Sequence, residues 1–149
     1  MDRRQANELD NYITGHYGED QLRDEIDLDG LVYLAAPYSD PSENKRNLRR
    51  EVINQVTADL IKMGNVIFSP ITHNAGLALI YDMPVNFSFW EEYDRLFVEK
   101  ADTLVVLNLP GWKDSRGVTQ EIAWAKEQTT PIVHLDPWGL TWDLCQQYL

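Results

Sequence analysis

The chain has 149 residues, of which 44% are hydrophobic and 25% charged, and this composition is that of one globular domain rather than a disordered tail or a fibre. Its 24 acidic and 13 basic residues give a formal net charge of −11, which argues against a nucleic-acid polymer as a partner. A single cysteine, Cys145, excludes an internal disulfide and a cysteine-based zinc site, and it favours a reducing, cytoplasmic setting.

No apolar stretch approaches the roughly 18 residues of a membrane span, and no apolar core follows the basic pair at the N-terminus, so we expect neither a membrane span nor a cleaved leader. Residues 1–30 hold nine of the acidic residues and only three of the basic ones. We interpret them as an acidic helical extension, with one or two short helices around Thr14 and Gly15. The remaining residues, 31–149, form the predicted domain.

From Leu31 onward, strand patterns alternate with helix patterns. The predicted strands are 31–36, 66–69, 103–109 and 131–135, and the predicted helices are 42–63, 86–101, 117–128 and 139–149. This alternation predicts an α/β fold, a three-layer Rossmann-like parallel sheet of four to five strands. Such sheets bind ligands beyond the C-terminal ends of their strands, which places the candidate site in the loops 36–42, 69–76 and 109–117.

Two of these loops have the character of ligand-binding loops. The first leaves its strand on small residues, which lets a ligand approach the backbone, and its candidate binding residues are Ala36, Pro37, Tyr38 and Ser39. In the third loop, Ser115, Arg116 and Gly117 enter a helix whose first amide groups would face an anion. A plain strand-to-helix turn is the alternative for the first loop.

Three more residues near these loops are candidates for contact with a nucleobase or phosphate. They are His73, Trp90 and Trp112. A loop-capping role for His73 and plain core packing for the two tryptophans are the alternatives. His16 and His134 have no companions that would make a metal site, and we expect neither a metal nor a cofactor.

Two acids lie on predicted helices at positions that face inward. Asp94 shares a stripe with Trp90, Phe97 and Val98 at spacings of three and four residues, and Glu121 stands at the edge of a buried helix face. A buried carboxyl group is either paired or takes a raised pKa, so Asp94 and Glu121 would suit an acid and nucleophile pair that cleaves a glycosidic bond. The alternative for Glu121 is a capping box.

Four segments in order, VYLAAPYSDP, FSPITH, FWEEYDRLFVEKADTLVVL and SRGVTQEIAWA, resemble the nucleoside 2-deoxyribosyltransferase superfamily, most closely its bacterial and phage branch of unknown function. The resemblance covers about residues 31–135. It implies a flavodoxin-type sheet, a homo-oligomer and three catalytic residues. Glu121 would attack the deoxyribose C1′ carbon, Asp94 would assist the departing base, and Tyr33 would orient the nucleophile.

The residue six positions before Glu121 separates two groups within this superfamily. Transferases that act on free nucleosides have an aspartate there to hold the 5′-hydroxyl, whereas this chain has Ser115. Its S-x-G-V-x-x-E string is similar to that of the 2′-deoxynucleoside 5′-monophosphate N-hydrolases, in which the serine accepts a phosphate. Positive charge for a phosphate would come from Arg116, Lys45 or Arg46.

Together these features predict an enzyme that cleaves the N-glycosidic bond of a 2′-deoxynucleoside 5′-monophosphate or a deoxynucleoside, by hydrolysis or deoxyribosyl transfer. One alternative is a nucleotide-binding or sensing module without turnover, and another is a ribosyl hydrolase that acts on a different nucleotide. The aromatic segment 81–93 exposes more apolar area than one small domain would cover, so we expect a homodimer or higher homo-oligomer.

Overall fold

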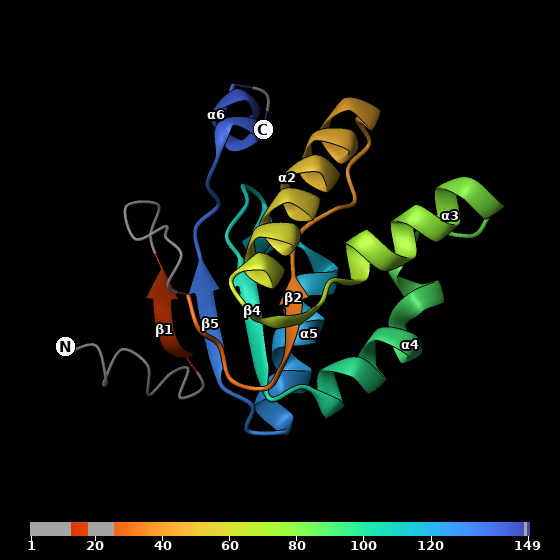
Figure 1. Ribbon diagram of the computed structural model, residues 1–149. Coiled ribbons are helices and arrows are strands. Elements are labelled where there is room, and N and C mark those ends of the chain that lie inside the picture. The colour runs from red at the N-terminus through yellow and green to blue at the C-terminus, as the bar shows by residue number, and fades with distance from the viewer. Residues whose placement is uncertain (1–12, 18–25, 148) are drawn as a thin grey trace.

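The computed structural model describes residues 13–17, 26–147 and 149, and it contains one parallel sheet between helices (Figure 1). The strands are β1 (Ile13–Tyr17), β2 (Leu31–Ala35), β3 (Val66–Phe68), β4 (Thr103–Leu107) and β5 (Ile132–Leu135), in the spatial order β1-β5-β4-β2-β3. Every neighbouring pair is parallel. The sequence prediction of a parallel α/β sheet is therefore confirmed, and the order of β2 to β5 is that of a flavodoxin-type core.

The helices cover both faces of this sheet. They are α2 (Glu43–Lys62), α3 (Gly76–Tyr81), α4 (Phe87–Lys100), α5 (Arg116–Glu127) and α6 (Leu140–Cys145), together with a π-helical turn, η2 (Ile71–Ala75), and a 3-10 turn, η3 (Trp112–Asp114). Figure 1 shows α2 on one side of the sheet and α5 on the other. None of the helices in the described part of the chain is long and apolar enough to cross a membrane.

Alternate residues of β2 point to opposite faces and so feed two separate cores. Val32 and Leu34 pack with the apolar stripe of α2, whereas Tyr33 and Ala35 pack with residues of α4 and α5. The stripe predicted for α2 is confirmed, because Val52, Val56 and Leu60 are fully buried. The hydroxyl of Ser42 accepts a hydrogen bond from the Lys45 amide at 3.3 Å, and this N-cap fixes where α2 begins.

The prediction of short helices near Thr14 and Gly15 is wrong. Residues Ile13–Tyr17 form an edge strand that pairs with β5, and the rest of the predicted helical extension lies outside the described residues. The segment ITGHY holds β-branched and aromatic residues and no acid, a composition that favours a strand over a helix. The acidic residues of this region, on which the helical prediction rested, precede and follow the strand in the sequence and are not part of it.

The second rim segment is not the simple loop that the sequence suggested. After Pro70 the chain forms the π-helical turn η2 and continues directly into α3. A π-helical turn shifts side chains relative to α-helical spacing, and such turns are frequent at functional sites. Here it places Asn74 in the buried interior beyond the end of β3.

Candidate active site

A cavity of about 370 Å³ lies at the C-terminal ends of β2, β3 and β4. All three predicted rim loops contribute to its wall, and α4 closes one side. The predicted site residues that line it are Ala36, Tyr38, Ser39, Trp90, Asp94, Ser115, Arg116, Gly117 and Glu121. Residues widely separated in the sequence are thus brought to one hollow, at the edge where parallel sheets bind ligands.

The carboxyl group of Glu121 is buried in this cavity against a tyrosine. Glu121 is only 4% exposed, and the Tyr33 hydroxyl, on the interior strand β2, donates a hydrogen bond to its Oε2 oxygen. The capping-box alternative for Glu121 is wrong, since it lies six residues after the N-cap residue Ser115. Tyr33 itself stands behind Glu121 and is not part of the cavity wall.

Asp94 reaches the same cavity from α4. It is 4% exposed, and the side-chain amide of Asn74 donates a hydrogen bond of 2.9 Å to its Oδ1 oxygen. Trp90 and Val98, one turn to either side of Asp94, are also buried. The inward stripe predicted for this helix is therefore confirmed, and it carries a carboxyl group into an apolar environment.

Burial perturbs both carboxyl groups. The pKa of Glu121 is raised to about 8. Burial is the largest cause and the charge of Asp94 adds to it, whereas the Tyr33 hydrogen bond lowers the pKa. Burial likewise raises the pKa of Asp94 to about 6, while the Asn74 hydrogen bond and the charge of His73 lower it. Two acids with different raised pKa values in one cavity make Glu121 and Asp94 a candidate catalytic pair.

The first turn of α5 forms another part of the wall. The Ser115 hydroxyl accepts a hydrogen bond from the Val118 amide at 3.2 Å, so it serves as the N-cap of α5. The amides of Arg116 and Gly117 have no carbonyl partner within the helix, as in any first turn. Arg116 brings a positive charge to the cavity wall, but Asp114 beside it brings a negative one. Lys45 and Arg46 do not line the cavity.

Aromatic rings form the apolar side of the cavity. Trp90 is buried with its indole N–H bonded to the Pro84 carbonyl at 2.8 Å, so its ring is fixed. Phe87 stacks on Trp124 and packs against Gly117, where an added Cβ would lie only 3.3 Å from its ring.

Arg49 holds two of the rim loops together. This buried guanidinium donates hydrogen bonds to the carbonyls of Tyr38, Ser39 and Pro110, at 3.3, 2.9 and 3.2 Å. Gly111 comes so close that an added Cβ would lie 2.9 Å from Arg49 Nη2. The sequence does not indicate that Arg49 is buried, because it is an arginine on the second turn of a polar helix.

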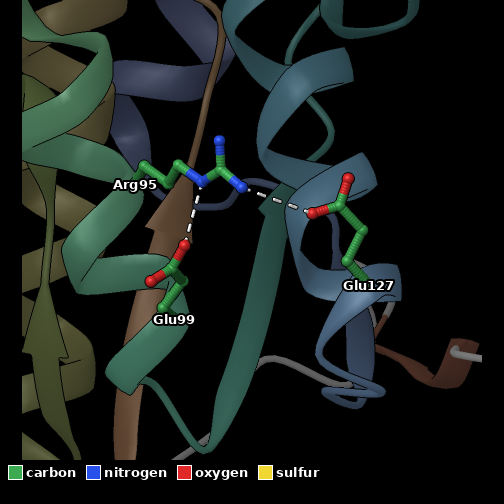
Figure 2. A network of polar contacts seen from close by, with 3 residues as sticks. All are labelled: Arg95, Glu99 and Glu127. Carbon is green, nitrogen blue, oxygen red and sulfur yellow. Dashed lines mark hydrogen bonds and ion pairs between the residues drawn. The ribbon is translucent and has the colours of Figure 1, made fainter.

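Charged side chains connect the two helices that carry the acids. Figure 2 shows Arg95 of α4 between Glu99 of the same helix, at 2.9 Å, and Glu127 of α5, at 3.6 Å. All three side chains are at least one-third exposed, so these pairs add little stability.

Three predicted binding residues do not line the cavity. Pro37 is buried behind the first loop, and His73 is exposed, with its ring stacked on Tyr93. Trp112 lies 5.0 Å from the His134 ring, measured between ring centroids, and lines a separate hollow of about 320 Å³. Trp112 therefore lies outside the wall of the main cavity.

Sequence reasoning missed several polar residues of the wall, chiefly Asn74, Asn86 and Asp114. Polar residues in loops give no periodic signal, so only the positions of Asn74 and Asp114 within the predicted rim loops pointed to the site. Among the described residues, no three His, Cys, Asp or Glu side chains gather in a way that would hold a metal ion.

Comparison with known families assigns most of the chain. The model of a family described as a domain of unknown function, DUF1937, matches residues 30–136. The chain belongs to this family. The match covers β2 to β5 and every residue of the cavity wall, so the candidate site lies wholly within the DUF1937 domain. A search of curated proteins gives no match.

The raised pKa of Glu121 predicts a pH-dependent stability effect of Glu121→Gln. Between its ordinary pKa of 4.5 and about 8, the folded DUF1937 domain keeps a proton on Glu121 that the unfolded chain releases. Glu121 thus lowers stability as pH rises, by roughly 1.4 kcal/mol per pH unit in this interval. Glutamine keeps an acceptor oxygen for Tyr33 and cannot ionise. In urea denaturation, the variant should gain stability over wild type from pH 5 to pH 8.

Glu127→Gln is the matched control, since Glu127 is an exposed residue on the same helix. The stability of this control relative to wild type should not increase from pH 5 to pH 8. A stability difference for Glu121→Gln that is the same at pH 5 and pH 8 would contradict a proton held on Glu121.

Proposed function

We propose that this protein is a cytoplasmic enzyme that cleaves the N-glycosidic bond of a 2′-deoxynucleoside or its 5′-monophosphate. One observation carries the proposal: Glu121, bonded to Tyr33, and Asp94, bonded to Asn74, are buried in the same cavity. The resemblance to the nucleoside 2-deoxyribosyltransferase superfamily supports it, because it implies the same three roles for Tyr33, Glu121 and Asp94.

In the first step, the ionised carboxylate of Glu121 attacks C1′ of the sugar. The C1′–N bond breaks, its electron pair goes to the base, and Asp94 supplies the proton that the base nitrogen takes up. The product is a deoxyribosyl ester of Glu121. The Tyr33 hydroxyl holds the nucleophile at the correct angle through its hydrogen bond.

In the second step, the deprotonated Asp94 takes a proton from water as the water oxygen bonds to C1′. The ester bond to Glu121 breaks, and the carboxylate is regenerated. A second base in place of water gives deoxyribosyl transfer. The aromatic side of the cavity, formed by Phe87 and Trp90, suits the leaving base, and the first turn of α5 suits the 5′ end of the sugar.

The first prediction for this mechanism concerns Glu121→Gln. The variant keeps side-chain volume and the Tyr33 contact but removes the attacking charge, so base release should fall by several orders of magnitude. Release of free base from the deoxynucleosides and their 5′-monophosphates measures it, with Glu127→Gln as control. Near-wild-type turnover would remove Glu121 from the mechanism. A wild-type protein that binds nucleotides without turnover would instead favour a sensing module.

The second prediction concerns the two residues that precede Arg116. A 5′-phosphate carries close to two negative charges, so Ser115→Asp should weaken use of monophosphates far more than use of nucleosides. Asp114→Asn removes a negative charge from the wall and should shift preference the other way. The ratio of kcat/KM for the two substrate types measures both effects. Equal changes for both types would show that this end of the cavity does not distinguish a phosphate.

We also propose that the protein works as a homodimer or higher homo-oligomer. The exposed apolar side chains of α3, α4 and the segment between them lie beside the cavity wall; they are Leu77, Leu79, Ile80, Tyr81, Val85, Phe89, Tyr93 and Leu96. Val85 also lines the cavity, so a second copy on this surface would exclude water from the site.

Replacement of the half-exposed Phe89 by serine should therefore reduce assembly and specific activity together. Light scattering and base release over a dilution series measure the two. Leu144→Ser, an exposed apolar residue on α6, is the control and should change neither. A monomer that keeps full activity at nanomolar concentration would contradict the oligomer.

A further inference from the structure

A line of hydrogen bonds connects the protein surface to Asp94. The exposed His73 contacts Asn74 through its Nδ1 atom, 2.8 Å from the amide oxygen Oδ1. The amide nitrogen of Asn74 in turn donates to Oδ1 of Asp94 at 2.9 Å. Asn74 is itself buried and lines the cavity, so both of its polar ends are used where water is scarce.

The direction of each hydrogen bond in this line is fixed by chemistry. An amide oxygen only accepts, so the Nδ1 atom of His73 carries the hydrogen, and an amide nitrogen only donates, so Oδ1 of Asp94 is the acceptor. The His73 ring is held by contact with Phe68 and by stacking on Tyr93, which keeps the amide from turning over. Oδ2 of Asp94 makes no hydrogen bond with any residue of the described chain.

We propose that Asn74 is a positioning residue that reserves Oδ1 of Asp94 as an acceptor, so that the proton of this acid is carried on Oδ2 and presented to the leaving base. The proposal rests on the function proposed above and deepens it. Asn74 acts through Asp94, and His73 acts through Asn74 by holding its amide in the required orientation.

Other groups around Asp94 act on its charge rather than on its orientation. Glu121 of α5 and Tyr33 of β2 lie within electrostatic reach of Asp94, and His73 of η2 is the nearby group that can become a cation. None of these three donates a hydrogen bond to Asp94 in the described structure. Loss of the Asn74 amide therefore frees the carboxyl group to turn without changing the number of charges around it.

The closing experiment compares Asn74→Leu, which has similar volume and no amide, with Thr72→Val. Thr72 is an exposed residue of the same π-helical turn, and it does not line the cavity. Each variant is given deoxynucleosides with ordinary bases and, for comparison, nitrophenyl 2-deoxyriboside. Its leaving group, nitrophenolate, departs without a proton. The single-turnover rate of leaving-group release reports the first step alone, and in Asn74→Leu it should fall roughly tenfold or more with ordinary bases and stay within about twofold with the nitrophenolate.

A merely structural role for Asn74 would lower both rates equally, and that result would overturn the proposal. Asn74→Ala is smaller and also lacks the amide, so it should show the same selective loss if Asn74→Leu does not fold. Thr72→Val should match wild type with both leaving groups.

A second measurement separates this proposal from the function on which it rests. In carbon-13 NMR of carboxyl-labelled aspartate, removal of a donor to the ionised form should raise the pKa of Asp94 in Asn74→Leu above its value in wild type. An unchanged or lower pKa overturns the Asn74 contact. If wild-type protein releases no base from any substrate while Asn74→Leu shows this rise in the pKa of Asp94, the proposed function is overturned and the positioning contact is established.

Discussion

The burial of the Glu121 carboxyl group against the Tyr33 hydroxyl is the interaction around which the site is organised. Tyr33 lies on the interior strand β2 within a cluster of buried apolar side chains, and its fully buried ring fixes where the hydroxyl stands. The hydroxyl requires an acceptor at that depth, and α5 supplies it. Ser115 and the tight packing of Gly117 on Phe87 set where α5 begins, and hence where Glu121 lies along it.

The same burial sets the protonation of the pair. Burial raises the pKa of Glu121 to about 8 and that of Asp94 to about 6, so at neutral pH a proton is favoured on Glu121 over Asp94. The proposed mechanism requires the opposite arrangement, with the nucleophile ionised and the acid protonated. Positive charge that develops at C1′ stabilises the ionised form of Glu121, so this environment favours the transition state over the resting site. In the proposed mechanism, the stability lost by burying Glu121 thus falls on the group that attacks C1′.

Sequence patterns were sufficient for the sheet and for the two acids, because both depend on local periodicity. An apolar run predicts a buried strand, as in β2 and β4. A spacing of four residues places side chains on one helix face, as for Trp90, Asp94 and Val98. Patterns failed where tertiary contacts decide the outcome. The edge strand Ile13–Tyr17 forms because β5 offers an unpaired edge, and the charges around it concealed this.

The positions of single rim side chains were equally hard to predict. Arg49 and Asn74 are held by backbone carbonyls and by side chains distant in the sequence, and neither gives a periodic signal. Trp112 belongs to the third rim loop in sequence, yet it lines a separate hollow, and the hydrophobic pattern does not distinguish the two positions. Such residues refine a site, whereas the regular elements that carry Tyr33, Asp94 and Glu121 create it.

The most direct measurement of the central claim is mass spectrometry of the protein after rapid acid quenching during turnover of a deoxynucleoside or its 5′-monophosphate. The account predicts a deoxyribosyl ester on the peptide that contains Glu121, absent from Glu121→Gln and absent when the ribose counterpart is not cleaved. Base release at full rate with no such ester under any quenching time, or an ester on a different residue, would contradict it.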